Sequence, residues 1–232
     1  MARSLDAPLV DPNSRPDSGA PPPPTPARFW DGYAAKYAAK PVPDEDAYER
    51  TLERVRAYLT PNDEVLELGC GTGTTALKLA ASARVIVATD YSAGMIDIAT
   101  EKARLEGVTN VRFRQCTALD ASFSPGSFDA LLAMNLLHLI ADIPALLARV
   151  HALLRPGGLF IAKTPLIGEK GLALRVAIPL LRWVGFAPYV NFVTERSLTA
   201  AVEAAGFELA ERGFYPEKQR HFLVVARKAP LT

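Results

Sequence analysis

Glycines at alternate positions follow a short apolar stretch in the first third of the chain. The sequence reads VLELGCGTG over residues 65–73, with glycine at 69, 71 and 73 and an acid, Glu67, just before them. Glycine adopts backbone conformations that other residues avoid, and its missing side chain lets a ligand approach the backbone closely. The stretch therefore predicts a ligand-binding turn that has a carboxylate beside it.

The spacing of these glycines separates two classes of ligand. A dinucleotide-binding turn reads G-x-G-x-x-G, which brings a helix N-terminus to a pyrophosphate. Here the spacing is G-x-G-x-G, and Glu67 would repel a pyrophosphate but suit a ligand that carries an ammonium group. Asp90 ends the next apolar stretch and could accept both ribose hydroxyls of either ligand. The glycine spacing and Glu67 thus favour a nucleoside such as S-adenosylmethionine, whereas Asp90 does not discriminate.

Strand-like and helix-like stretches alternate along most of the chain. This alternation predicts an α/β fold in which helices cover both faces of a mostly parallel sheet, a three-layer α/β/α arrangement. The last two strands follow each other without a helix, which requires an antiparallel final strand, because parallel neighbours need a longer crossover. The expected strands are 64–68, 84–90, 111–115, 128–135, 159–164, 208–215 and 221–228, and the expected helices among them are 72–81, 93–107, 144–154 and 197–206.

The ordered motifs resemble those of class I S-adenosylmethionine-dependent methyltransferases. The motifs are ELGCGTG, the acid in TDYS that ends the second strand, FD at the start of the fourth, and LRPGG before the fifth. The resemblance is greatest to the small-molecule branch of the ubiquinone/menaquinone-biosynthesis type and covers roughly residues 29–228. It implies a Rossmann-like seven-stranded sheet with a reversed last strand. It also implies in-line methyl transfer from S-adenosylmethionine to a small molecule, a hydrophobic one included, with S-adenosylhomocysteine as product.

The resemblance also implies a role for each matched position. The glycines should pack under the methionine moiety, Glu67 should organise the turn near its ammonium group, and Asp90 should hold the ribose hydroxyls. Tyr91 should pack on the adenine face, and Met95 should line the same pocket. The expected cofactor contacts are Tyr37, Glu67, Gly69, Cys70, Gly71, Gly73, Asp90, Tyr91, Met95, Thr117, Ala118, Leu119, Met134 and Asn135.

The residues after the third strand depart from the family pattern. The family usually has an aspartate there that contacts the adenine amino group, but QCTALD places Thr117 at that position. Asp120, three residues on, could substitute, or the Thr117 hydroxyl and backbone contacts could suffice. Adenine binding is therefore the part of the site that the resemblance leaves open.

His138 is expected to face the acceptor, because it follows the fourth strand at the ligand-binding edge. An imidazole titrates near neutral pH and could take the proton that an oxygen or nitrogen acceptor loses, and a positioning or packing role is the alternative. Tyr37 belongs to an aromatic stretch, RFWDGYAAKYAAK, that either closes over the cofactor or fixes its helix through buried area. The sequence shows no metal-ligand spacing, so no metal is expected.

Composition and charge are those of one globular domain with a tail. The 232 residues are 49% hydrophobic and 22% charged with a formal net charge of +1, which does not match a basic nucleic-acid binder. Cys70 and Cys116 form no disulfide framework and no secretory signal is visible, so a cytoplasmic protein is expected. The expected divisions are a disordered proline-rich tail at 1–27, cap helices at 28–60 and the methyltransferase domain at 61–232, with an acceptor-side insert at about 165–189.

The partners and the competing functions complete the expectations. Residues 172–190 are apolar but contain two arginines and two prolines, which argue against a membrane span. Contact of this stretch with a membrane surface is an alternative to the expected partner, a small-molecule acceptor. No nucleic-acid partner is expected, and the oligomeric state is not predicted. The competing functions are a cofactor-binding regulatory module without turnover and a nicotinamide-dependent oxidoreductase, which the glycine spacing and the reversed strand oppose.

Overall fold

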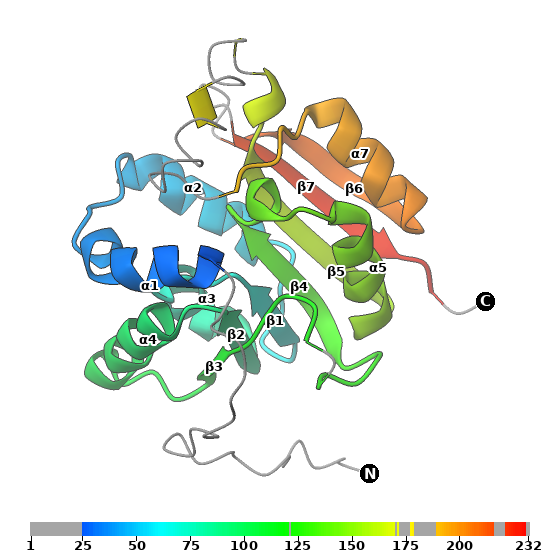
Figure 1. Ribbon diagram of the computed structural model, residues 1–232. Coiled ribbons are helices and arrows are strands. Elements are labelled where there is room, and N and C mark those ends of the chain that lie inside the picture. The colour runs from blue at the N-terminus through cyan, green and yellow to red at the C-terminus, as the bar shows by residue number, and fades with distance from the viewer. Residues whose placement is uncertain are drawn as a thin grey trace.

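A computed structural model gives the three-dimensional structure of the protein (Figure 1). It describes residues 25–120, 122–169, 171, 177–178, 189–215 and 221–230. Most of the proline-rich tail and most of the insert expected at 165–189 therefore lie outside the described residues. The same is true of most of the apolar stretch 172–190, for which contact with a membrane surface was the alternative.

Within the described part of the chain, seven strands form one sheet through the centre of the molecule (Figure 1). Their spatial order is β3-β2-β1-β4-β5-β7-β6. Neighbours from β3 to β5 are parallel, whereas β7 is antiparallel to both β5 and β6, which confirms the predicted reversed last strand. The strands are β1 (Glu64–Leu68), β2 (Val85–Asp90), β3 (Val111–Gln115), β4 (Phe128–Met134), β5 (Leu154–Pro165), β6 (Phe207–Phe214) and β7 (His221–Lys228).

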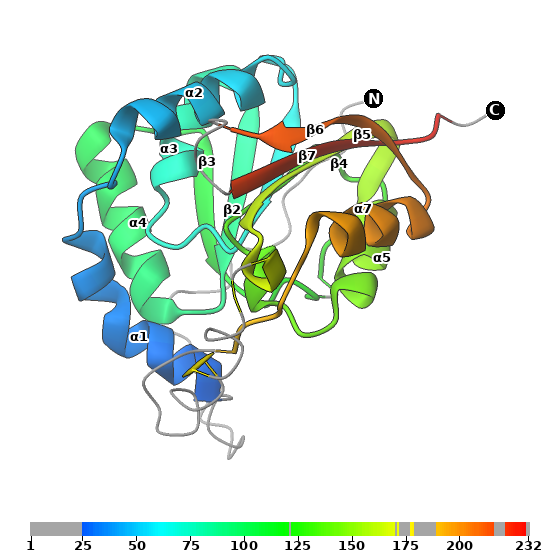
Figure 2. The same ribbon diagram turned by 90° about the horizontal axis from the view of Figure 1, so that it is seen from above.

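Helices cover both faces of the sheet and complete the three-layer arrangement (Figure 2). Helices α2, α3 and α4 lie on one face, α5 and α7 lie on the other, and α1 packs beside α4. Four of these helices begin at side chains that cap them, Asp44 for α2, Ser92 for α4, Asp142 for α5 and Thr194 for α7. The described helices are α1 (Thr25–Ala38), α2 (Glu45–Arg56), α3 (Thr74–Leu79), α4 (Ala93–Glu106), α5 (Ile143–Leu153) and α7 (Glu195–Ala204), with short 3-10 turns η1 (Ala80–Ser82), η2 (Leu137–Leu139) and η3 (Ile167–Glu169).

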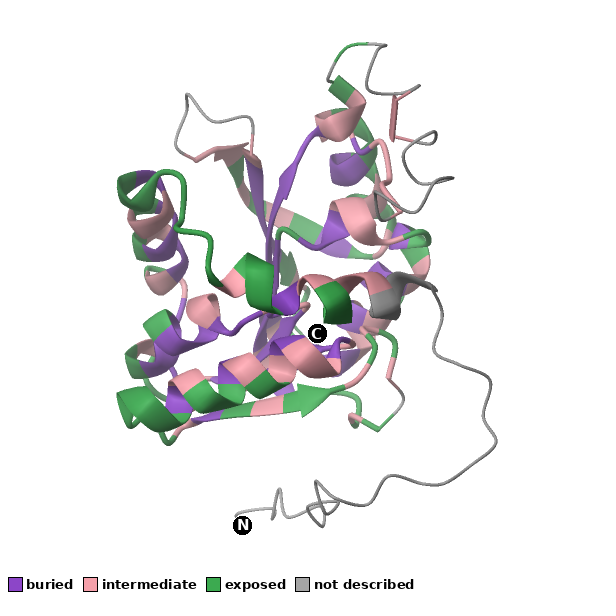
Figure 3. Cartoon of the chain, turned by 60° about the vertical axis from the view of Figure 1, so that its left-hand side comes forward, coloured by how far each residue is buried: buried purple, intermediate pink, exposed green. Residues whose placement is uncertain are grey.

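Alternate residues of the central strands feed two apolar cores, one under each layer of helices. In β5, Leu159 and Ile161 belong to the core under α2 and α3, whereas Phe160 and Ala162 belong to the core under α5 and α7. Figure 3 shows the buried residues concentrated in the sheet and on the helix faces turned toward it. Each fully buried leucine or phenylalanine stabilises the fold by roughly 1.5–3 kcal/mol, so burial on both faces stabilises the sheet.

Strand β5 begins earlier than the sequence predicts. It starts at Leu154 rather than at residue 159, so the LRPGG segment is an irregular first part of the strand and not a loop. Gly157 has a φ of +78° within this part, and Arg155 is bonded to Glu64 and Asp129 at 2.5 Å each. These ion pairs at the amino edge of the sheet keep the segment beside β4.

The N-terminal helices also differ in detail from their predicted bounds. Helix α1 begins at Thr25, so its first turn overlaps the end of the expected tail at 1–27. Helix α2 ends at Arg56, a few residues before the end of the expected cap region at residue 60. Of the helices that the structure describes, none has the length and apolar character needed to cross a membrane.

Candidate cofactor and active site

The turn after β1 has the glycine geometry that the sequence predicts. The φ angles of Gly69, Gly71 and Gly73 are +65°, +54° and +76°. This is the left-handed region, where a residue with a side chain is strained. Helix α3 begins directly after Gly73, so the turn carries the chain from the carboxyl end of β1 to a helix N-terminus.

The surroundings of the three glycines differ in a way that indicates where a ligand could lie. A Cβ on Gly69 would stand 2.7 Å from Leu136, and a Cβ on Gly73 would stand 2.6 Å from Phe113, so the protein itself packs against both. A Cβ on Gly71 would meet only the Tyr37 ring, at 3.9 Å, among the described residues. The face of the turn at Gly71 is therefore open beneath Tyr37.

Asp90 ties the glycine turn to the loop after β2. Its Oδ2 accepts a hydrogen bond from the Gly71 N–H at 3.0 Å, and its Oδ1 accepts one from the Ser92 N–H at 2.9 Å. Burial raises the pKa of Asp90, and these backbone bonds oppose the rise. An ionised carboxylate has about four lone-pair positions, so Asp90 keeps capacity for two hydroxyl donors of a ligand.

Glu67 lies beneath the turn and is only 1% exposed. Its Oε2 has no hydrogen-bond partner among the described residues, although the carboxyl group accepts a bond from the Ala76 N–H. Burial, and then the negative charge of Asp90, raise the pKa of Glu67 to about 8. A buried acid with an unpartnered oxygen and a second acid nearby is suited to a ligand that brings a positive charge.

Cys70 and Cys116 lie at the ends of β1 and β3 but are not activated thiols. Cys70 is buried, and its backbone N–H donates to the Thr89 carbonyl at 2.9 Å. Burial raises the pKa of the Cys70 thiol, and it raises the pKa of Cys116 to about 11. A reactive thiolate needs the opposite shift, so these side chains fill the turns rather than supply a nucleophile.

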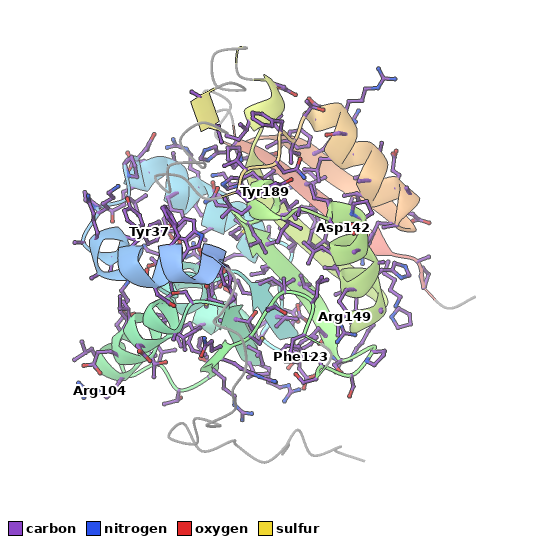
Figure 4. The ribbon with its side chains drawn as sticks, viewed as in Figure 1. Tyr37, Arg104, Phe123, Asp142, Arg149 and Tyr189 are labelled. Atoms are coloured by element: carbon purple, nitrogen blue, oxygen red, sulfur yellow. The ribbon has the colours of Figure 1, made fainter. Side chains whose placement is uncertain are left out.

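Tyr37 lies over the glycine turn from helix α1 (Figure 4). The residue is 45% exposed, and its pKa is raised by burial and then by the charge of Asp90. The rings of Trp30 and Tyr33 lie 6.3 Å from its ring, so the aromatic residues form one cluster along the helix. The structure thus brings Tyr37 to the turn while its aromatic neighbours pack with one another.

Asp31 makes contacts beside the site that the sequence did not predict. Its Oδ1 accepts a hydrogen bond from the Ser92 hydroxyl at 2.6 Å and one from the Gly94 N–H at 3.3 Å. These bonds fasten α1 to the first turn of α4, next to the loop that carries Asp90. In the sequence, Asp31 is visible only as the acid within RFWDGY, because its hydrogen-bond partners are far away along the chain.

The residues expected on the adenine side of the site differ in how far they are buried. Met95 is buried at the start of α4, and burial raises the pKa of Tyr91 to about 12. Thr117 and Leu119 are exposed, whereas Ala118 is half-buried. All five residues lie at or just beyond the carboxyl ends of β2 and β3, so the fold brings them to the same edge as the glycine turn.

Asp120 is committed to its own loop. Its Oδ1 accepts a hydrogen bond from the Ser122 N–H at 2.7 Å, and Arg114 lies 3.8 Å away, which keeps the pKa of Asp120 below its usual range. Arg149 donates to the carbonyls of Asp120 and Phe123 at 2.8 Å each and fixes this loop (Figure 4). Thr117 is therefore the better placed of the two expected candidates for a ligand contact.

The end of β4 holds the one strained residue other than glycine in the described chain. Asn135 has a φ of +56° and is exposed, and its N–H donates to the Lys163 carbonyl at 2.6 Å. Met134, just before it, is buried. Strain of this kind persists only where the surroundings impose it and is common at functional sites.

His138 lies in the short turn η2 beyond β4. Its Nδ1 is 3.2 Å from the hydroxyl of the buried Thr164, and its carbonyl accepts a hydrogen bond from the Asn191 N–H at 2.7 Å. The threonine at the end of β5 thus orients the imidazole, and the 189–194 segment is joined to the same turn. Among the described residues, no cluster of His, Cys, Asp and Glu could hold a metal ion.

Comparison with known proteins agrees with this geometry. Residues 65–158 match the family model described as a methyltransferase domain. The ubiquinone biosynthesis O-methyltransferase of Azorhizobium caulinodans is 33% identical over 151 residues, which are 63% of this chain and 59% of that protein. The protein of the same name from Rhizobium etli is 29% identical over 185 residues, 78% of this chain and 71% of that protein. The chain thus spans less than two thirds of the first of these relatives.

Solved structures show the same fold at low sequence identity. A geranyl diphosphate C-methyltransferase from Streptomyces coelicolor A3(2), solved with Mg²⁺, geranyl diphosphate and S-adenosyl-L-homocysteine, matches with a TM-score of 0.67. The match covers 90% of this chain and 100% of that one at 15% identity, so it speaks for the fold alone. The strand order and the glycine turn are consistent with the methyltransferase-domain match over residues 65–158. By sequence, the chain resembles the O-methyltransferases of ubiquinone biosynthesis.

Proposed function

We propose that this chain binds S-adenosylmethionine and transfers its methyl group to an oxygen atom of a small molecule. The observation that carries the proposal is the open face of Gly71 beneath Tyr37, with the buried acids Glu67 and Asp90 beside it. A ligand with an ammonium group and a ribose suits this arrangement, whereas Glu67 beside the turn does not suit a pyrophosphate. The relatives named as O-methyltransferases support an oxygen acceptor.

Each part of the cofactor has residues suited to hold it. Glu67 would complement the ammonium group, and the free lone pairs of Asp90 would accept the ribose hydroxyls. Tyr91 and Met95 would flank the adenine, and Tyr37 would cover the methionine end. The other proposed cofactor contacts are Gly69, Cys70, Gly71, Gly73, Thr117, Ala118, Leu119, Met134 and Asn135.

The residues of the chain would mainly align the acceptor and exclude water. The cofactor, when bound, supplies a methyl group on a sulfonium, which is already a good leaving group, so alignment is the larger part of the task. Asn135 and His138 lie just beyond the end of β4, where Asn135 has a left-handed φ and the His138 ring is hydrogen-bonded to Thr164. His138 would either take the proton of the acceptor hydroxyl or position the acceptor.

Methyl-labelled S-adenosylmethionine tests the proposal. The full chain would be incubated with it and a bacterial extract, which is then split into organic and aqueous phases, with Asp90→Ala beside it. Label in a small molecule, absent with Asp90→Ala, is the expected result. Binding of S-adenosylhomocysteine without transfer to any fraction would instead support a cofactor-binding module. Failure to bind it in calorimetry would contradict the proposal.

We also propose a cytoplasmic location and a small-molecule partner rather than nucleic acid. The net charge of +1 is not the strongly basic charge that is typical of nucleic-acid binders. Both cysteines are free thiols in the structure, which suits a reducing compartment. Fractionation of a tagged full chain in its own host would test the location.

A further inference from the structure

The connection from β3 to β4 crosses the sheet without a helix in its described residues. It occupies residues 116–127, of which 116–120 and 122–127 are described. Strands β2 and β1 lie between β3 and β4, so the chain covers a lateral distance of roughly 14 Å. A parallel crossover is usually a helix, whose backbone groups bond to one another. Here the backbone groups need partners from elsewhere in the chain.

Arg149 of helix α5 supplies two of these partners (Figure 4). Its Nη2 donates to the carbonyls of Asp120 and Phe123 at 2.8 Å each. Its Nε is buried without a hydrogen-bond partner, and no carboxylate of the described chain forms an ion pair with the guanidinium. A half-buried cation with an unpartnered donor is costly, so packing alone does not explain Arg149. Its bonds instead fix the course of the crossover.

These bonds continue from Arg149 to the turn at the end of β3. The Asp120 N–H donates to the Thr117 carbonyl at 3.1 Å, which closes a four-residue turn. Ala118, inside this turn, packs against the core under α5 and α7. Thr117 and Leu119, on either side of Ala118, are exposed. The turn is therefore held through its last residue by Arg149 and through Ala118 by the core.

The turn has hydrogen-bond acceptors that no described residue uses. They are the Thr117 hydroxyl and the carbonyls of Ala118 and Leu119. Strand β3 ends beside the end of β2, which carries Asp90, so these acceptors lie at the edge of the sheet where the ribose is proposed to bind. An amino group on a flat ring could donate to acceptors that are fixed at this place.

We propose that Arg149 is a positioning residue that sets the preference of the site for adenine. It holds the turn where an acceptor meets the 6-amino group of the ring, and it acts through the turn rather than on the ring itself. The inference rests on the proposed function and adds a residue that determines base specificity. Hypoxanthine has a carbonyl oxygen in place of that amino group, so a fixed acceptor would face another acceptor. A turn released from Arg149 would lose this discrimination.

The test compares S-adenosylhomocysteine with S-inosylhomocysteine, which carries hypoxanthine in place of adenine. Calorimetry on the full chain should show that the adenine ligand binds at least tenfold more tightly. Arg149→Met should reduce this preference to less than threefold. Arg149→Lys keeps N–H donors that can reach one carbonyl, so its preference should exceed that of Arg149→Met.

A second variant breaks the same path without changing helix α5. Asp120→Pro removes the N–H that bonds to the Thr117 carbonyl, and Arg149 stays in place. It should lower the preference to less than threefold as well, and it decides the matter if Arg149→Met does not fold. Thermal unfolding identifies the variants that are folded.

Arg227→Met is the matched control. Its Nη1 also donates to a backbone carbonyl, that of Gly157 at 2.9 Å, but this bond joins β7 to the first part of β5 at the opposite edge of the sheet. Removing it should leave the preference at its original value. A loss of stability alone therefore does not imitate the expected result.

Each other outcome has a definite meaning. A preference that survives in folded Arg149→Met or Asp120→Pro would overturn the inference, and so would an equal weakening of both ligands, which a purely structural role would give. No preference in an unaltered chain that binds S-adenosylhomocysteine would overturn it too and leave the proposed function standing. Failure of the unaltered chain to bind S-adenosylhomocysteine would count against the proposed function itself.

Discussion

The two halves of the sheet's carboxyl edge carry different types of residue. The cofactor half, formed by the ends of β1 and β2, consists of left-handed glycines and two buried acids, Glu67 and Asp90. The acceptor half, formed by the ends of β4 and β5, holds a buried lysine, Lys163, and an imidazole, His138. In the proposed transfer, the two acids would face the cationic donor, and Lys163 and His138 would lie on the side of the acceptor.

The halves also differ in what holds them. Contacts with the backbone fix the cofactor half, because Asp90 accepts hydrogen bonds from two backbone N–H groups. The left-handed φ angles of the glycines would strain any residue with a side chain at these positions. The acceptor half is fixed by side chains, such as Thr51 on Lys163 and Thr164 on His138. Side chains can be exchanged without changing the fold, so the acceptor half is where one scaffold can adopt different substrates.

The largest expected effect comes from a pair of glycine substitutions in the cofactor half. Gly73→Ala should destabilise the protein by about 3 kcal/mol, since left-handed strain adds to a contact with Phe113. Gly71→Ala should lose only about 1 kcal/mol, because strain acts there alone, yet it should weaken S-adenosylhomocysteine binding. Urea unfolding and calorimetry measure both. Equal losses of stability would show that the face at Gly71 is not open.

Asp90→Asn should have the next largest effect, on affinity rather than on stability. The amide keeps the shape but loses the charge that strengthens hydrogen bonds to hydroxyl donors, so affinity for S-adenosylhomocysteine should fall by about 2 kcal/mol, roughly 30-fold. Asp129→Asn is the control, because Asp129 binds the Glu64 N–H and Arg155 at the opposite edge. It should lower stability and leave affinity unchanged. Unchanged affinity in Asp90→Asn would remove that residue from the site.

The geometry of the glycine turn and its place at the end of β1 were the parts that the sequence predicted well. The glycines, Glu67 and Asp90 are neighbours in local motifs, and strand-end positions follow from the alternation of strands and helices. The acceptor half was predicted only through His138 and the end of β4. The hydroxyl to which Lys163 donates belongs to helix α2, more than a hundred positions away in sequence. No local sequence pattern reports such a contact.

The same distinction explains the smaller differences. The segment LRPGG reads as a loop, because proline and glycine interrupt strands, but ion pairs from Arg155 to Glu64 and Asp129 hold it in β5. Asp31 reads as one acid in a helix, and its bond to the Ser92 hydroxyl appears only when α1 packs on α4. In each case a long-range polar contact decides what a local propensity cannot.

Glu67→Gln should change how the cofactor half responds to pH. The pKa of Glu67 is about 8 in the folded protein against 4.5 for the ordinary group, so folding takes up a proton between these values. Stability from this group should therefore fall by up to about 1.4 kcal/mol per pH unit as the pH rises from 4.5 to 8, and stay level above. Chemical unfolding across that range measures the slope, which Glu67→Gln should remove.

Cofactor binding gives the matching measurement for Glu67. If the ammonium group of the ligand stabilises the ionised acid, binding of S-adenosylhomocysteine at pH 7 should release about one proton. Calorimetry in two buffers of different ionisation enthalpy reports that number. Glu67→Gln should bind without release. A release that survives this substitution would assign the proton to another group, with Asp90 first in line.

The smallest expected effect concerns Tyr37 and decides between the two roles of the aromatic helix. Tyr37→Leu should weaken S-adenosylhomocysteine binding by about 1 kcal/mol, roughly fivefold, because the ring covers the turn at Gly71. Its effect on stability should stay within about 0.5 kcal/mol, since the residue is 45% exposed. Tyr33→Leu, one helical turn away in the same cluster, is the control and should leave affinity unchanged. If both substitutions lower stability and neither lowers affinity, the aromatic residues only fix the helix, and the cofactor half ends at the glycine turn.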